Sequence, residues 1–168
     1  MSQATNITDQ LPLAWPSYIA GEPVQSDETL EVRYPWDGSL TGTLPKITPE
    51  QLEQAIAAAL GQAQPPTKNE RYEILMRARE LLAKRTDEFA NLIRLEAGLC
   101  MRETRYEVGR AQEVFKFAAA EALRDDESIF SCDAAKNGPA RKIFTLREPL
   151  SLVAAITPFN HPLNQVAH

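Results

Sequence analysis

The chain has 168 residues, 43% of them hydrophobic, and a formal net charge of −5, and this length suffices for one ordinary domain with its own core. Its mild acidity, without basic clusters, excludes a typical nucleic-acid-binding protein, and no apolar run approaches the length of a membrane span. Two cysteines are too few for a disulfide framework, so we expect a cytoplasmic protein with no nucleic-acid or membrane partner.

Three short strands are predicted in the first part of the chain. Residues 1–16 are polar and contain two prolines, which is typical of a loose arm. Residues 18–22 and 29–34 then have the composition of strands, with a turn expected at Gly21 between them. A third strand is expected at residues 41–45.

Four helices are expected next, and most of their ends carry local signals. Residues 48–51, Thr-Pro-Glu-Gln, form a capping box with proline at the first helical position, so a helix begins there. A second helix is expected over residues 69–84, where apolar residues recur at helical spacing. Thr86 is expected to cap a third helix, which Gly98 ends. The fourth, over residues 102–124, has a broad apolar face.

Arg110 lies beside the apolar face of the fourth helix and has two interpretations. Its guanidinium can pair with Glu107 or Glu113, about one helical turn away, as exposed charges on helices commonly do. Alternatively, it turns toward a substrate channel, where a guanidinium binds an anionic group through two parallel hydrogen bonds. The spacing alone favours the first interpretation.

A hairpin and a buried strand are predicted in the C-terminal part of the chain. Residues 129–133 and 140–147 have strand composition, and Asn137 followed by Gly138 is a turn signal between them. Residues 150–156 form an almost unbroken run of small and β-branched apolar side chains, which is typical of a strand buried on both faces in a parallel sheet. Ligands commonly bind at the carboxyl end of such a strand.

The turn after this strand carries the candidate site. It offers the polar residues Thr157, Asn160, His161 and Asn164 around two prolines. The side-chain N–H of Asn160 can donate to a developing oxyanion, or the residue can stabilise the turn, since asparagine readily bonds its own backbone. His161 is likewise either a ligand or a structural residue of the turn. We expect His168 to be structural.

One stretch of the chain has a recognisable order, namely residues 147–150 (Arg-Glu-Pro-Leu), Val153 and residues 157–164 (Thr-Pro-Phe-Asn-His-Pro-Leu-Asn). This order resembles the segment that opens the core of the NAD(P)-dependent aldehyde dehydrogenase superfamily. The resemblance extends back through the second and third helices and so covers nearly the whole chain. It rests there on Arg71, Ile74, Leu75, Leu81, Leu82, Arg85, Ala90, Ile93, Glu96 and Gly98.

The resemblance implies a site and a cofactor. In this family the asparagine of the turn lines the oxyanion hole, which implies that Asn160 is the oxyanion residue. The backbone before it runs beside the nicotinamide cofactor, NAD or NADP, which implies cofactor contacts for Ile156, Thr157, Pro158 and Phe159. No metal is implied.

A narrower resemblance comes from the Glu-Val-x-Arg-Ala order that ends at Ala111 and from residues 160–168. These residues most resemble phosphonoacetaldehyde dehydrogenases, with lactaldehyde and non-phosphorylating glyceraldehyde-phosphate dehydrogenases nearby. It implies that the partner is a small-molecule aldehyde with a phosphonate group. Arg110 and His161 are implied as the residues that bind this anionic group.

For the fold, the resemblance implies an α/β architecture with a helix-rich N-terminal part, short strands, a β-hairpin and the first core strand of the NAD-binding sheet. Residues 1–126 are expected to pack on the NAD-binding domain. Residues 127–148 are expected to form an oligomerisation hairpin, which pairs with a neighbouring subunit of a homo-oligomer. Residues 149–168 are expected to begin the Rossmann-like NAD-binding core.

Two functional hypotheses follow from what the 168 residues contain. Cys100 and Cys132 do not match the motif of the family's nucleophile, and no Gly-x-Gly-x-x-Gly occurs. The first hypothesis is the N-terminal part of an enzyme that oxidises an anionic aldehyde, phosphonoacetaldehyde above others, with NAD(P). The alternative is a truncated, catalytically inactive chain that acts at most as an interaction module. An independent all-helical binding domain is a third interpretation, but it does not explain a helix that starts at a catalytic-looking turn.

Overall fold

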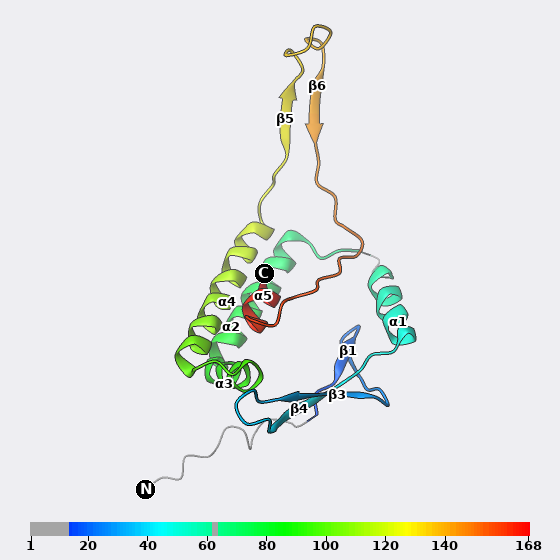
Figure 1. Cartoon of the computed structure of the whole chain (residues 1–168). Helices are drawn as coiled ribbons and strands as arrows, with labels where there is room; N and C mark the ends of the chain where they lie inside the picture. Colours follow the sequence, from blue (N-terminus) through cyan, green and yellow to red (C-terminus); the bar gives the residue numbers. More distant parts are fainter. Residues whose placement is uncertain (1–13, 62–63) are drawn as a thin grey trace.

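The computed structural model describes residues 14–61 and 64–168. Among these residues the strands form antiparallel pairs, β1 with β2, β3 with β4 and β5 with β6, and most of the helices lie together in one group (Figure 1). The expected α/β class is therefore confirmed. The elements in chain order are β1 (Ser17–Ile19), β2 (Glu22–Val24), β3 (Thr29–Arg33), β4 (Leu40–Pro45), α1 (Pro49–Leu60), α2 (Lys68–Lys84), α3 (Thr86–Ala97), α4 (Met101–Ala122), β5 (Ser128–Ser131), β6 (Lys142–Thr145) and α5 (Pro162–Ala167).

The β1–β2 hairpin replaces the single strand expected at residues 18–22. Ala20 and Gly21 both have positive φ angles, 52° and 84°, so the chain reverses direction at this point. Positive φ is rare outside glycine and is found mainly in turns. The expected turn at Gly21 is present, but it lies inside the predicted strand rather than after it.

The last residues of the expected loose arm are held on β4. Ala14 bridges to Thr43, and the N–H of Trp15 donates to the carbonyl oxygen of Thr43 at 2.9 Å. Backbone pairing of this kind ties down a chain end that would otherwise be loose. The expectation is therefore wrong for Ala14 and Trp15, and residues 1–13 lie outside the described residues.

The starts of α1 and α2 follow local side-chain signals. The Thr48 hydroxyl accepts from the N–H of Gln51 at 3.2 Å, and the side-chain oxygen of Gln51 accepts from the N–H of Thr48 at 3.0 Å. This is the capping box predicted for α1. A second capping box, between Thr67 and Glu70, starts α2 at Lys68, one residue before the expected position.

The start of α3 differs from the expectation that Thr86 is its N-cap. The N-cap residue is Arg85, and the Thr86 hydroxyl donates backwards to the carbonyl oxygen of Ala83 at 2.9 Å. The last carbonyl groups of a helix have no partner inside it. Because α2 ends immediately before α3, the Thr86 hydroxyl binds one of these groups instead. Gly98 ends α3 as expected, with a left-handed φ of 71°.

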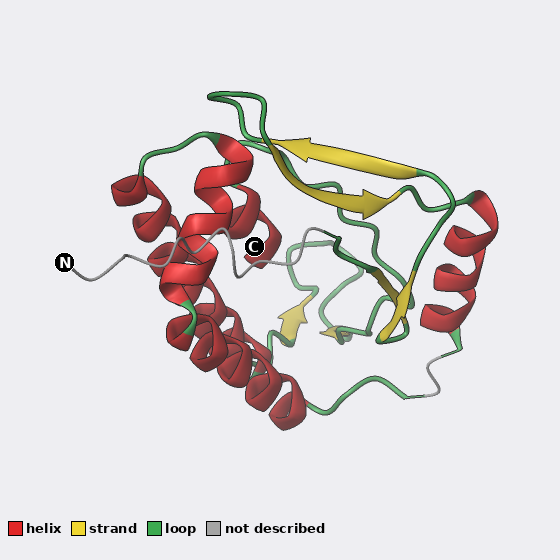
Figure 2. Ribbon diagram, turned by 90° about the horizontal axis from the view of Figure 1, so that it is seen from below, coloured by secondary structure: helices red, strands yellow, loops and turns green. Residues whose placement is uncertain are grey.

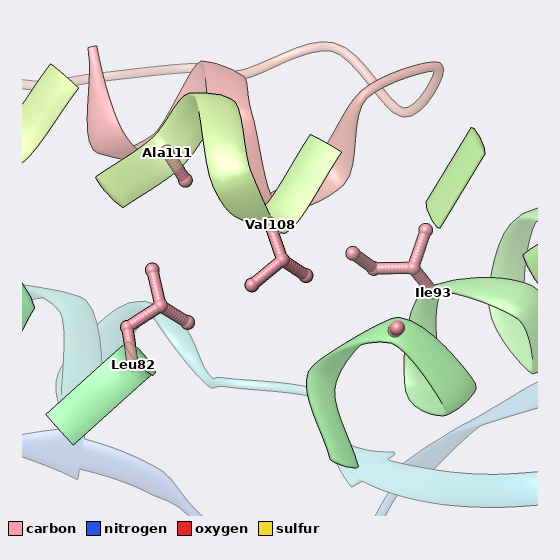
Figure 3. Packing of buried hydrophobic residues seen from close by; sticks show 5 residues of the cluster. Leu82, Ile93, Val108 and Ala111 are labelled. Carbon is pink, nitrogen blue, oxygen red and sulfur yellow. The ribbon is translucent and has the colours of Figure 1, made fainter. Parts of the chain in front are cut away.

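The hydrophobic core lies where α2, α3 and α4 meet. Leu82 from α2, Ile93 from α3 and Val108 from α4 are buried and point toward one another (Figure 3). Ala90 and Ala111 belong to the same cluster, and such small side chains let helices approach closely. α5 joins this group of helices, whereas α1 lies apart from it (Figure 1, Figure 2). No helix within the described ranges is long and apolar enough to cross a membrane.

The β5–β6 hairpin has the expected location. It pairs Ser128 with Thr145 and Ser131 with Lys142, and it projects away from the helices (Figure 1). Its strands expose four large apolar side chains, those of Ile129, Phe130, Ile143 and Phe144.

Residues 150–156 do not form the expected buried strand. They lie in an irregular stretch between β6 and α5, and their side chains are exposed, that of Ile156 completely. A central parallel strand needs hydrogen-bonding neighbours on both sides. No strand in the described part of the chain pairs with this stretch. The apolar pattern is therefore present without a sheet that buries it.

Candidate functional site

The candidate turn links residues 150–156 to α5. Pro158 and Pro162 flank it, and proline fixes the φ angle at both positions. Pro162 occupies the first turn of α5, where proline is well tolerated. Between the prolines, Phe159 is 91% exposed and Asn160 is exposed as well. The turn therefore presents Asn160 to solvent immediately before the helix.

The carboxylate of Glu107, from α4, binds the start of α5. Its Oε1 accepts hydrogen bonds from the N–H groups of Leu163 and Asn164, each at 3.0 Å. Its Oε2 lies 3.4 Å from Nδ1 of His161. Glu107 is only 2% exposed, so these contacts are made away from water, where hydrogen bonds to a charged group are strong.

Sequence reasoning missed this role of Glu107, although the pattern of α4 contains a signal for it. Thr104, Val108 and Ala111 are fully buried and follow one another at helical spacing. Glu107 lies within the same stripe, so its side chain points into the protein. A charged group in such a stripe needs a partner, and the start of α5 supplies it.

His161 and Asn164 occupy different environments. His161 is the N-cap residue of α5, and its side chain is 45% exposed and makes no capping hydrogen bond. Asn164 is fully buried, and it contributes its backbone N–H to the contact with Glu107. The turn therefore does not offer the side chain of Asn164 to a ligand, because its polar atoms are buried, without a hydrogen-bond partner among the described residues.

Arg110 forms no ion pair with another described residue, contrary to the interpretation that its spacing favours. Glu107 faces α5 instead, and Glu113 pairs with Lys116 at 2.9 Å. The exposed Arg110 lines a hollow of about 460 Å³ on the surface of α4. The other lining residues are Tyr106, Gly109, Glu113, Val114, Phe117 and His168.

The two histidines have different surroundings. His161, implied beside Arg110 at the substrate, is not among the residues that line the Arg110 hollow. His168, expected to be structural, does line it. The structure therefore brings Arg110 together with His168 and holds His161 against Glu107.

Neither cysteine lies at the turn. Cys100 is the exposed N-cap residue of α4, and Cys132 is half-buried in the loop of the β5–β6 hairpin. Within residues 14–61 and 64–168, no three His, Cys, Asp or Glu side chains gather as they would to hold a metal ion. The turn itself therefore offers hydrogen-bond donors and no thiol.

Residues 156–159 fit a contact with a flat, partly polar ring such as nicotinamide. Their backbone polar groups form no hydrogen bond with another described residue and remain available to a ligand. Ile156 and Phe159 add exposed apolar surface beside these groups. This surface therefore offers both apolar contacts and backbone hydrogen-bond groups.

Comparisons with known proteins agree on one family. The aldehyde dehydrogenase family matches residues 23–168. A 3-sulfolactaldehyde dehydrogenase from Priestia aryabhattai is 35% identical over 156 residues, which cover 90% of this chain and 32% of that protein. Aldehyde dehydrogenase 21 from Physcomitrella patens, solved in complex with the reaction product succinate, has a TM-score of 0.84 at 26% identity, over 94% of this chain and 34% of its own. NADP-dependent glyceraldehyde-3-phosphate dehydrogenase from Bacillus halodurans, complexed with NADP, has a TM-score of 0.79 at 30% identity, over 89% of this chain and 33% of its own.

These similarities extend well beyond the turn and include the helices and the hairpin. The chain spans about a third of the length of the relatives it matches. The NADP complex agrees with the expected cofactor of the family, NAD or NADP. From its fold and from the match over residues 23–168, the chain belongs to the aldehyde dehydrogenase family.

Proposed function

We propose that this chain is the N-terminal part of an enzyme that oxidises a small, anionic aldehyde to the carboxylic acid with NAD or NADP. The observation that carries the proposal is the turn before α5, where Asn160 is exposed and Glu107 holds the adjoining helix start. Residues 149–168 then begin the NAD-binding core. Phosphonoacetaldehyde is the favoured substrate.

In the reaction proposed, a thiolate attacks the aldehyde carbon, as in the family, and the carbonyl oxygen acquires negative charge. The side-chain N–H of Asn160 donates a hydrogen bond to this oxygen and stabilises the transition state more than the ground state. A preorganised donor of this kind raises kcat by about 10²–10³-fold. Residues 156–159 would hold the nicotinamide ring, which would supply the hydride acceptor, and Ile156 and Phe159 would contribute apolar surface beside it. Loss of the hydride leaves a thioester, which water then hydrolyses to the acid.

We propose an anionic substrate because the guanidinium of Arg110 is available to bind a negatively charged group. Its guanidinium has no ion-pair partner in the described part of the chain and lines a hollow with aromatic walls. A guanidinium matches the geometry of a sulfonate, phosphate or phosphonate group. Two relatives are named for aldehydes that carry such groups, 3-sulfolactaldehyde and glyceraldehyde 3-phosphate. His161 does not line this hollow, and its half-exposed ring is proposed as a second donor that acts from the turn.

The test compares an anionic with an uncharged aldehyde, using the complete polypeptide that carries these residues. Arg110→Ala should lower kcat/KM for phosphonoacetaldehyde by about 10- to 150-fold, because a hydrogen bond to a charged group contributes about 1.5–3 kcal/mol. For propionaldehyde, kcat/KM should change by less than about twofold. Arg102→Ala is the matched control, since Arg102 is on the same helix, is 89% exposed and pairs with the neighbouring Glu103. Equal losses for both aldehydes would remove Arg110 from the substrate site.

A second candidate function is that of a catalytically inactive interaction module. The β5–β6 hairpin favours it, because its exposed apolar side chains and strand edges can pair with another copy of the chain. In the enzyme, the same hairpin is proposed to join the subunits of a homo-oligomer. The intact mass of the native protein and its formation of NADH separate the two functions. A mass near 18.7 kDa without aldehyde-dependent NADH formation supports the module, and a larger mass with this activity supports the enzyme.

A further inference from the structure

The start of α5 has no cap of its own. The first N–H groups of a helix lack partners inside it, and the N-cap side chain usually accepts from one of them. His161 is the N-cap residue and makes no such bond, and Pro162 has no N–H to satisfy. The next two N–H groups, of Leu163 and Asn164, both donate to Oε1 of Glu107. A carboxylate from another helix therefore takes the place of the missing cap.

Burial makes Glu107 dependent on this contact. The residue is 2% exposed, and no lysine or arginine of the described chain forms an ion pair with it. A buried carboxylate without hydrogen-bond partners is very costly. The helix start and the carboxylate therefore satisfy each other, and neither can move away without leaving a buried polar group unpaired.

Glu107 also contacts the side chain of the residue next to Asn160. Oε2 of Glu107 lies 3.4 Å from Nδ1 of His161, the residue that follows Asn160. Asn160 itself is exposed, and its side chain has no hydrogen-bond partner among the described residues. The position of Asn160 is therefore set by its neighbours in the chain, and Glu107 holds those on its C-terminal side.

We propose that Glu107 is a positioning residue: through the start of α5, it holds Asn160 where its side chain meets the developing oxyanion. The inference rests on the proposed role of Asn160 in catalysis. Glu107 does not touch the substrate in this account, and it acts only through the turn. Displacement of a catalytic group by about 1 Å can lower a rate by about 100-fold, so a small shift of the turn suffices to impair catalysis.

The test is a double-mutant cycle in the complete polypeptide, with Glu107→Ala, Asn160→Ala and both together. Glu107→Ala should lower kcat by about 10- to 100-fold and leave KM within about twofold. In the Asn160→Ala background, the same substitution should lower kcat by less than about twofold, since residues that act through one another are not additive. Glu107→Gln should recover much of kcat, because its side-chain oxygen still accepts from the two N–H groups. Glu121→Gln is the control, since Glu121 is exposed on the same helix and pairs with Arg124.

Hydrogen exchange tests the contact itself. In the 168-residue chain, the amides of Leu163 and Asn164 should exchange at least about tenfold faster in Glu107→Ala than in the wild type or in Glu121→Gln. If Glu107→Ala does not fold, Glu107→Asp, whose carboxylate is one methylene shorter, serves for both arms, with smaller effects in the same direction. Unchanged exchange, or additive losses of kcat in the cycle, would overturn the positioning role alone. An unchanged kcat in Asn160→Ala would overturn the proposed function and, with it, this inference.

Discussion

We expect substitutions at two neighbouring residues of α4 to change the free energy of unfolding in opposite directions. Val108 is fully buried and points between Leu82 and Ile93 (Figure 3), whereas Gly109 is exposed. Val108→Ala removes two methyl groups, which is a loss of about 1.6 kcal/mol at about 0.8 kcal/mol for each buried group. The cavity left behind raises the expected loss in the free energy of unfolding to about 2–3 kcal/mol.

Gly109→Ala is the matched control for this substitution. A Cβ atom at Gly109 would have no neighbouring atom within 4 Å, and the backbone there is helical. Alanine should therefore stabilise α4 by about 0.5–1 kcal/mol through its higher helix propensity.

Urea unfolding and thermal unfolding, both followed by circular dichroism, measure the two changes in the free energy of unfolding. For a chain of this size, Val108→Ala should lower the melting temperature by about 4–12 °C, because 1 kcal/mol corresponds to about 2–4 °C. For Gly109→Ala, both the urea midpoint and the melting temperature should rise slightly. If Val108→Ala left the midpoint unchanged, or if Gly109→Ala lowered it as much, the assignment of the inner face of α4 would be refuted.

Three further predictions concern the helix ends. Thr67→Ala should lower the free energy of unfolding by about 1 kcal/mol, since it removes the capping hydroxyl of α2, and urea unfolding checks this value. Hydrogen bonds from the N–H and hydroxyl of Thr67 lower the pKa of Glu70 from its ordinary 4.5. The ionised Glu70 therefore stabilises the fold above pH 4.5, and this stabilisation is lost as the pH falls through the lower pKa of the folded state. The stability difference between the wild type and Glu70→Gln should therefore shrink below pH 4.5, and a constant difference would contradict it. Gly98→Ala should cost about 1–2 kcal/mol, because its φ is 71° and its new Cβ would lie 3.3 Å from Cβ of Pro35, while Gly98→Asn should cost less.

Helix ends were predictable because their signals are local. The hydroxyl of Thr48 and the side chain of Gln51 are three residues apart, so the sequence alone specifies their capping box. Thr86 shows the limit of such reasoning. Its hydroxyl has two sets of backbone groups within reach, the carbonyls that end α2 and the N–H groups that begin α3, and composition does not decide between them.

The remaining differences between the structure and the expectations from the sequence involve partners that are distant in the chain. The contact of Glu107 with Leu163 and Asn164 joins residues 56 and 57 positions apart, so it can be inferred only as the need of a buried carboxylate for some partner. The run at residues 150–156 has the apolar pattern of a parallel strand, but a strand forms only when neighbouring strands supply its hydrogen bonds. Spacing predicts a helical ion pair for Arg110, but Glu107 binds the start of α5 and Glu113 pairs with Lys116 instead.

The single-turnover rate of NADH formation in Asn160→Ala tests the central claim most directly. It is measured in the complete polypeptide that carries these residues, with saturating aldehyde and cofactor, so that product release does not contribute. If the side chain of Asn160 donates to the oxyanion, this rate falls by about 10²–10³-fold while the melting temperature stays close to that of the wild type. A rate equal to that of the wild type in a folded variant would contradict the claim, and the turn before α5 would then be structural.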